Sequence, residues 1–221
     1  MSRSTEIVVI MDQSGSMNAI KDDAIGGFNA FLEAQQKEPG EARLTLVLFD
    51  TVGYVERHIS TPLAEVQPLS DATYKPCGGT PLLDAIGNTV KKVDERLAEQ
   101  DTPRQGHEDA RKMDLGEESE EDEQRVIVAV LTDGQENSST SFTKDAIAKL
   151  ITEHEEKGWA FLFLAANMDA VGEARSLNIQ SSNAEQWTGG QGLRCAYMGL
   201  SAATKNYRSG GSGALHDANQ S

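Results

Sequence analysis

The chain has 221 residues, 38% of them hydrophobic and 25% charged, which is typical of a soluble globular protein with a sizeable core. The formal net charge of −15 argues against binding nucleic acid through its phosphates, because that mode needs clustered Lys and Arg. No apolar run approaches the ~18 residues that cross a bilayer, and the N-terminus lacks a secretory signal pattern, so we expect a cytoplasmic protein without membrane contact.

The first part of the chain predicts a strand, a helix and two further strands. Glu6–Met11 and Arg43–Phe49 are nearly continuous apolar runs, typical of parallel strands covered on both faces. Met17–Gln36, between them, has apolar residues at three- and four-residue spacing, which predicts a helix. Only a tight turn separates the second strand from Val52–Ser60, and a parallel crossover needs a dozen or more residues. Val52–Ser60 is therefore predicted to be an antiparallel edge strand.

The middle of the chain alternates between helix-like and strand-like stretches. Leu82–Glu99 and Thr143–Lys157 have the apolar spacing of helices, whereas Val126–Thr132 and Ala160–Ala166 are apolar runs typical of buried strands. Residues 101–124 hold ten acidic and three basic residues without apolar periodicity. We interpret them as a solvated, mobile insertion, either without a partner or acting as an acidic docking arm for a basic protein.

The last part of the chain predicts smaller elements. Asp169–Leu177 is expected to be a short helix, Asn183–Trp187 a weak strand and Leu193–Tyr207 a closing helix, while residues 208–221 predict a disordered tail. No repeat or linker divides the chain, so we expect a single domain over residues 1–207. Its class is α/β, with a Rossmann-like, doubly wound, mostly parallel sheet, one antiparallel edge strand and helices on both faces.

Polar side chains follow the predicted parallel strands at their carboxyl ends, where ligands of open α/β sheets bind. Asp12, Ser14 and Ser16 follow the first strand, and Asp133 follows the strand Val126–Thr132. The edge strand runs in the opposite direction, so the segment after it must carry the chain back to this edge. We therefore expect Thr80, just before a helix, to lie beside the other four residues.

These three hydroxyls and two carboxylates are all hard oxygen donors. Such a set suits Mg²⁺ or Mn²⁺, whereas Zn²⁺ prefers nitrogen or sulfur. Because hydroxyl ligands are neutral, they leave the cation electrophilic, and it can take an Asp or Glu carboxylate of a protein partner. Each hydroxyl on its own is better explained as a helix cap. The convergence of all five groups at one edge favours the metal site.

Three segments at this edge resemble a known site: DQSGSM, GGT before a helix, and TDG after a buried strand. Together they resemble the metal-ion-dependent adhesion site of von Willebrand factor type A domains. The resemblance implies that Ser14, Ser16 and Thr80 contact the metal, with Asp12 and Asp133 binding it directly or through water. It also implies that a partner's carboxylate completes the coordination shell.

The resemblance covers about residues 5–207, and a narrower likeness exists within it. GGTPLLDAIG, TDGQENSS and FLFLAANMDA are similar to small intracellular prokaryotic type A proteins, some of which are associated with tellurium-resistance and stress-response systems. The acidic insertion at 101–124 departs from the compact pattern of that family.

Several residues near this edge keep two interpretations. Asn167 and Asp169 either assist the metal ligands or cap a loop, and Glu136 either tunes selectivity or faces water. Cys77 is either a redox sensor or an ordinary loop thiol. It and Cys195 are expected to be reduced, with a single disulfide as the alternative.

The alternative function is a Mg²⁺-dependent phosphohydrolase that uses Asp12 as its nucleophile. Ser14, however, stands where a second carboxylate acting as acid or base is expected. The sequence also contains no GxxxxGK[ST] phosphate loop and no plausible Ser-His-Asp set. We therefore expect a binding module without catalytic residues.

Overall fold

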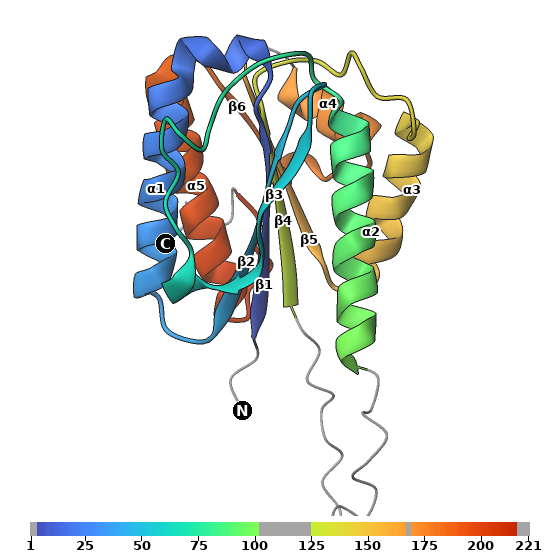
Figure 1. Ribbon diagram of the computed structural model, residues 1–221. Coiled ribbons are helices and arrows are strands. Elements are labelled where there is room, and N and C mark those ends of the chain that lie inside the picture. Colours follow the sequence, from blue (N-terminus) through green and yellow to red (C-terminus); the bar gives the residue numbers. More distant parts are fainter. Residues whose placement is uncertain (1–3, 102–124, 167–168, 216–221) are drawn as a thin grey trace, which may run out of the picture.

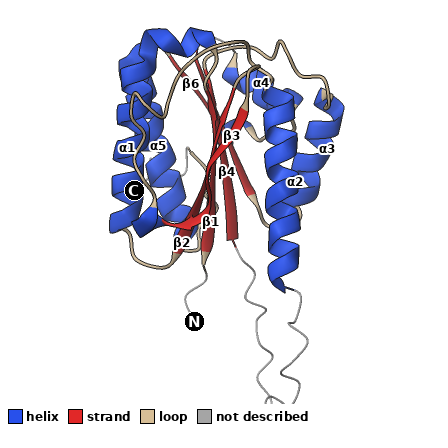
Figure 2. Ribbon diagram, viewed as in Figure 1, coloured by secondary structure: helices blue, strands red, loops and turns tan. Residues whose placement is uncertain are grey.

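A six-stranded sheet separates two layers of helices in the computed structural model, which describes residues 4–101, 125–166 and 169–215 (Figures 1 and 2). The strands are β1 (Thr5–Asp12), β2 (Ala42–Phe49), β3 (Tyr54–Pro62), β4 (Arg125–Thr132), β5 (Ala160–Ala166) and β6 (Ala184–Trp187). Their order across the sheet is β3-β2-β1-β4-β5-β6. All neighbouring strands are parallel except β2 and β3, which confirms the predicted sheet with its antiparallel edge strand.

Helices α1 (Lys21–Lys37) and α5 (Gly189–Arg208) cover one face of the sheet, and α2 (Leu82–Asp101), α3 (Lys144–Glu155) and α4 (Ala170–Ser176) cover the other (Figure 1). Short 3₁₀-helices are η1 (Gly15–Ile20), η2 (Leu63–Glu65) and η3 (Ser181–Asn183). This arrangement confirms the predicted α/β architecture with helices on both faces. None of the helices in the described part of the chain is long and apolar enough to span a membrane.

The side chains of β1 show why its sequence is apolar throughout. Ile7, Val9 and Met11 belong to the core under α1 and α5, whereas Val8 and Ile10 belong to the core under α2 and α3. Each of the five is at most 1% exposed. Both faces of the strand are buried, so alternation between polar and apolar residues is absent, as expected for a central parallel strand.

The edge strand begins two residues later than the sequence pattern predicted. Oδ1 of Asp50 accepts hydrogen bonds from the backbone N–H groups of Val52 (2.6 Å) and Gly53 (2.8 Å). These bonds close the turn after β2, so Val52 lies in the turn with 79% of its surface exposed, and pairing starts at Tyr54. An aspartate that bonds to following backbone N–H groups is a common turn former.

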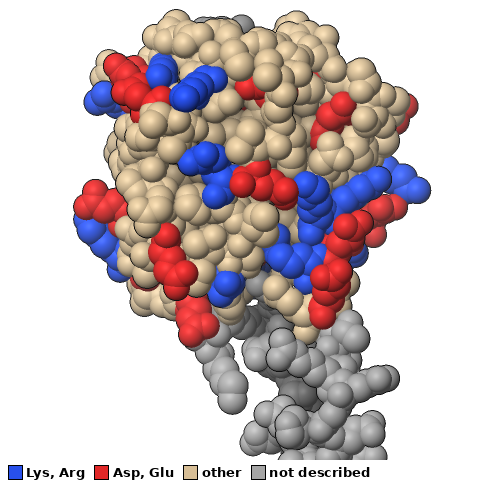
Figure 3. Space-filling model, in the orientation of Figure 1, with Lys and Arg blue, Asp and Glu red and all other residues tan. Residues whose placement is uncertain are grey.

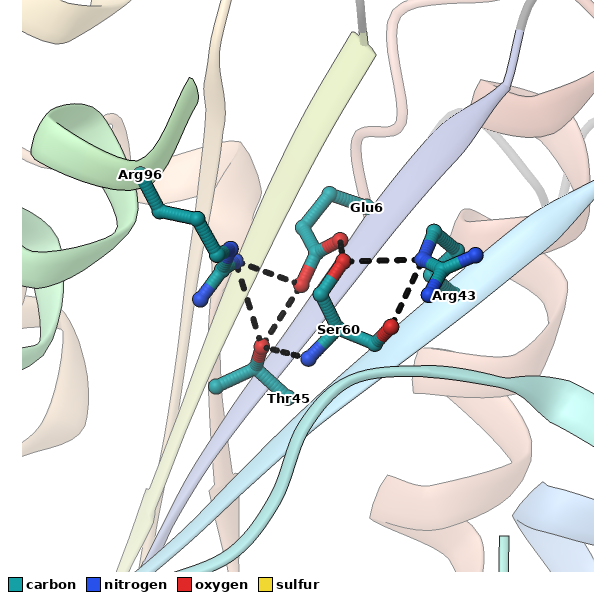
Figure 4. A network of polar contacts seen from close by, with 5 residues as sticks. All are labelled: Glu6, Arg43, Thr45, Ser60 and Arg96. Carbon is teal, nitrogen blue, oxygen red and sulfur yellow. Dashed lines mark hydrogen bonds and ion pairs between the residues drawn. The ribbon is translucent and has the colours of Figure 1, made fainter. Parts of the chain in front are cut away.

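A buried polar network anchors the end of β1 that lies opposite the carboxyl edge (Figure 4). Glu6 is fully buried and accepts hydrogen bonds from Thr45 Oγ1 (2.6 Å) and Ser60 Oγ (2.8 Å). Arg96 of α2 completes the network with an ion pair of 2.9 Å to Glu6. The network joins the edge strand and α2 to the centre of the sheet.

The C-terminal segment corrects one prediction. Residues 208–215 were expected to belong to a disordered tail, yet Leu215 is 2% exposed and belongs to the core under α1 and α5. Arg208 donates hydrogen bonds to the backbone oxygens of Gln35 (2.7 Å) and Gly40 (2.9 Å), near the C-terminus of α1. Apolar burial and these bonds fix the segment. Residues 216–221, and 102–124 of the predicted insertion, lie outside the described residues.

Candidate metal centre

Asp12, the last residue of β1, forms the floor of the candidate metal centre, which we define as Asp12, Ser14, Ser16, Thr80 and Asp133. Its side chain has no exposed surface. Oδ1 accepts a hydrogen bond from the backbone N–H of Ser14 (2.7 Å), and Oδ2 accepts one from the hydroxyl of Thr132 (2.6 Å). Burial raises the pKa of Asp12 to about 6, because an ionised carboxylate is poorly solvated there.

Ser14 and Ser16 lie beside this carboxylate, and their Oγ atoms are 3.0 Å apart. Ser14 occupies the N-cap position of η1 but makes no side-chain capping hydrogen bond, so capping does not explain it. The predicted single helix Met17–Gln36 is divided into η1 and α1, because the backbone of Ile20 (φ −129°, ψ 19°) is not helical.

Asp133, the residue after β4, contacts Ser16. The hydroxyl of Ser16 donates a hydrogen bond of 2.6 Å to Asp133 Oδ1, across 117 residues of sequence. Burial also raises the pKa of Asp133. The carboxyl ends of β1 and β4 therefore meet as the strand order predicted.

Thr80 faces the same point from a third segment. A Cβ atom placed on Gly134 would lie 3.2 Å from Thr80 Oγ1 and 3.8 Å from Ser16 Oγ. Both hydroxyls therefore point toward the space over Gly134, which its missing side chain leaves open. The structure thus brings all five predicted residues to one edge of the sheet.

A tether at Gln13 explains how the chain returns to this edge after β3. The backbone N–H of Gln13 donates to Phe49 O (2.8 Å), and its backbone oxygen accepts from the N–H of Cys77 (2.8 Å). Its side chain donates to Asp50 Oδ2 (3.1 Å) and accepts from the N–H of Lys75 (3.1 Å). One buried glutamine therefore holds the β2–β3 turn and the returning segment against β1.

The five residues differ in how deeply their side chains are buried. Asp12, Ser14 and Thr80 are 0%, 2% and 2% exposed, whereas Ser16 is exposed and Asp133 is half-buried. The centre therefore opens to solvent beside Ser16 and Asp133.

The donor chemistry fits a divalent cation. Among the ion pairs of the described residues, none includes Asp12 or Asp133, so two neighbouring carboxylates have no basic partner. Within the same described ranges no group of three His, Cys, Asp or Glu side chains is arranged to hold a metal. A site at this edge therefore depends on hydroxyl donors, a set that suits Mg²⁺ or Mn²⁺.

The structure decides several alternatives that the sequence left open. Glu136 is half-buried, and its carboxylate holds backbone groups: Oε2 accepts from the N–H of Leu83 (2.9 Å) and Oε1 from the N–H of Ser138 (2.7 Å). Oδ1 of Asp169 accepts from the N–H of Gly172 (2.8 Å), which confirms a capping role. Asn167 lies outside the described residues.

Both cysteines are free, as expected, and both are exposed. Sγ of Cys77 donates a hydrogen bond of 3.3 Å to Asp50 Oδ2, and this bond raises the pKa of the thiol. A raised pKa lowers the thiolate fraction, which disfavours a redox-sensing role.

Comparisons with known proteins identify the fold. No family model and no curated protein matches the sequence. Von Willebrand factor type A from Catenulispora acidiphila has a TM-score of 0.54 at 14% identity, over 92% of this chain and 43% of that one. The pilus adhesin SpaC from Lactobacillus rhamnosus GG, in its open conformation, has a TM-score of 0.63 at 12% identity, over 93% and 30%.

Proximal thread matrix protein 1 from the mussel byssus is also similar, with a TM-score of 0.55 at 13% identity, over 93% of this chain and 46% of that one. This chain spans less than half the length of each of the three proteins. At these identities the likeness shows the fold alone, which is like that of von Willebrand factor type A.

Proposed function

We propose that this chain is a divalent-metal-dependent protein-binding module. Mg²⁺, or Mn²⁺ in its place, is held by Asp12, Ser14, Ser16, Thr80 and Asp133, and an Asp or Glu carboxylate of a partner protein completes the site. The observation that carries the proposal is the convergence, at the carboxyl edge of the sheet, of three hydroxyls and two carboxylates that have no basic partner among the described residues. The metal, when bound, supplies the positive charge that attracts the partner's carboxylate.

The residues of the centre divide this task. The carboxylates of Asp12 and Asp133 supply the negative charge that retains a divalent cation. The hydroxyls of Ser14, Ser16 and Thr80 add neutral donor oxygens without offsetting more of its charge. Ser16 is the exposed member of the set and marks where the partner enters.

Two other functions fit less well. Asp12 has no exposed surface and both of its carboxylate oxygens accept hydrogen bonds, so it is poorly placed as a nucleophile for phosphate hydrolysis. Figure 3 shows Lys and Arg interleaved with Asp and Glu over the described residues of one face, which does not resemble a nucleic-acid-binding surface. A stress-response role depends on the likeness of three sequence stretches alone and forms no part of this proposal.

The first test measures metal binding directly. Free Mn²⁺ is followed by electron paramagnetic resonance during titration of the whole chain, with competition by Mg²⁺. Ser14→Ala is expected to weaken binding at least about 10-fold, since it removes a donor oxygen. Ser181→Ala, an exposed serine before β6, is the matched control. Equal binding by Ser14→Ala and the wild type would contradict the assigned site.

The second test concerns the partner. Proteins from the native host are captured on the immobilised chain in Mg²⁺ or in chelator, with wild type and Ser14→Ala compared. Partners that depend on both the metal and Ser14 support a metal-bridged contact, whereas identical capture under all conditions refutes it. Phosphatase turnover that requires Mg²⁺ and is abolished by Asp12→Asn would replace the binding function with the enzymatic one.

A further inference from the structure

The loop between β4 and α3, residues 133–143, holds the backbone of Thr80 at both of its polar groups. Oδ1 of Asn137 accepts a hydrogen bond from the Thr80 N–H (2.9 Å). The backbone N–H of Asn137 in turn donates to the Thr80 oxygen (3.3 Å). One asparagine therefore fixes the backbone of a candidate metal ligand that lies 57 residues away.

Two carboxylates, one from the loop and one from α2, join the same loop to the start of α2. Oε2 of Glu136, in the loop, accepts from the N–H of Leu83 (2.9 Å) in the first turn of α2. Asp84, in that turn, accepts from the loop N–H groups of Ser141 and Phe142 (2.9 Å each). Since each segment supplies a carboxylate to the other's backbone, the loop and the start of α2 are held together.

Gly79 makes room for this contact. A Cβ atom at Gly79 would lie 2.9 Å from Asn137 Oδ1 and 2.7 Å from Ser138 Oγ. The Asn137 side chain therefore passes directly over the residue before Thr80. A side chain at position 79 would push it away.

We propose that Asn137 is the positioning residue of Thr80. Asp133 and Asn137 belong to the same loop, so the bonds from Asn137 fix Thr80 relative to Asp133 and keep two parts of the metal centre in register. This inference rests on the proposed metal-binding function and assigns no metal contact to Asn137. Groups that orient metal ligands in this way change metal affinity by about 10–100-fold when they are removed.

The test uses Mn²⁺ as the probe and the whole chain as the protein. Asn137→Ala is expected to weaken Mn²⁺ binding by about 10–100-fold while the protein in chelator still unfolds cooperatively. Asn137→Asp keeps an oxygen that accepts from Thr80 and is expected to bind Mn²⁺ at least as tightly as the wild type. Asn88→Ala, an exposed asparagine of α2, is the matched control and leaves binding unchanged.

A second variant reaches the same contact by another route. Gly79→Ala displaces the Asn137 side chain and removes none of the five donor oxygens, so it is expected to weaken Mn²⁺ binding in the same direction. If Asn137→Ala does not fold, Gly79→Ala alone still tests the positioning role of Asn137. The backbone amide resonance of Thr80 reports the change independently, because it shifts in both variants in chelator if Asn137 donates and accepts as described.

The outcomes separate this inference from the proposed function. Wild-type protein that does not bind Mn²⁺ overturns the metal centre itself. Wild-type protein that binds Mn²⁺, together with Asn137→Ala and Gly79→Ala variants that bind it equally well, overturns only the positioning role.

Discussion

The burial of Asp12 predicts that the metal centre costs stability when no metal is bound. Its carboxylate has no exposed surface and accepts two hydrogen bonds, from Ser14 and Thr132. An asparagine at this position preserves the shape of the side chain. Its oxygen accepts from the Ser14 N–H, and its amide donates to the Thr132 hydroxyl, which in turn donates to Gly134 O at 3.0 Å. Asp12→Asn therefore removes the charge and leaves no buried polar group unpaired.

The size of the effect follows from the pKa of Asp12, which burial raises from 3.8 to about 6. At 1.36 kcal/mol per unit, this rise means that the ionised carboxylate destabilises the folded protein by about 3 kcal/mol above pH 6. The penalty declines as the pH falls from 6 toward 4, because the carboxyl becomes protonated in the folded state first. We therefore expect Asp12→Asn to be more stable than the wild type in chelator by up to about 3 kcal/mol at pH 8, and by roughly half of that at pH 5.

Saturating Mg²⁺ is expected to reduce or reverse this difference. A ligand at 100 times its dissociation constant stabilises the folded wild type by about 2.7 kcal/mol. The variant lacks one of the carboxylates and gains much less. Only the wild type therefore becomes substantially more stable on adding the metal.

Urea unfolding in chelator and in Mg²⁺, at pH 8 and pH 5, measures these differences for the wild type and Asp12→Asn. Asp71→Asn is the control, because the Asp71 side chain is 79% exposed and its removal is expected to change the free energy of unfolding by less than about 1 kcal/mol. Lower stability of Asp12→Asn than of the wild type in chelator at pH 8 would contradict a burial cost at Asp12. A difference from the wild type that does not shrink at pH 5 would contradict it as well.

The remaining predictions concern packing away from the metal centre. Arg96→Ala leaves the buried carboxylate of Glu6 without its ion pair. We therefore expect urea unfolding to show that the free energy of unfolding falls by about 3–5 kcal/mol, while the affinity for Mn²⁺ is unchanged. A large loss of Mn²⁺ affinity would contradict the separation of the two sites. At Gly27 a Cβ would lie 2.2 Å from Cδ2 of Tyr197, whereas at Gly26 it meets nothing within 4 Å. We therefore expect Gly27→Ala to lose about 1–3 kcal/mol and Gly26→Ala to gain about 0.5–1 kcal/mol, and equal thermal unfolding of the pair would refute the packing argument.

The sheet was predictable because the sequence of each central strand is apolar at nearly every position. Strands buried on both faces need apolar residues at every position, and a two-residue gap after Phe49 allows only a hairpin. The features that the sequence pattern missed depend on contacts between distant segments. Glu6 lies in an apolar strand without any local sign of Arg96, 90 residues later. The burial of Leu215 depends in the same way on packing under α1 and α5.

The convergence of the five residues of the candidate metal centre was predictable to a similar extent. The sequence signal is local for Asp12, Ser14 and Ser16, which follow a buried strand at alternate positions. Thr80 could be placed only by following the path of the chain back to this edge. The role of Asn137 gave no periodic signal, because one asparagine in a polar loop is compatible with any surface turn. The nearest sign in the sequence is Gly79, where a missing side chain admits a close neighbour.

The choice of hydroxyls over carboxylates in this centre has an energetic reason. Burial raises the pKa of Asp12, the hydroxyl and N–H groups of Thr132 and Ser14 lower it, and the charge of Asp133 raises it further. A third carboxylate at position 14 would add repulsion and remove a stabilising donor, so the protein without metal would be less stable. Two carboxylates offset the charge of a divalent cation without exceeding it, and the neutral donors leave the cation able to accept one further anionic oxygen. In the proposed function, this choice of residues therefore limits the cost of folding without metal and leaves a coordination position for a partner's carboxylate.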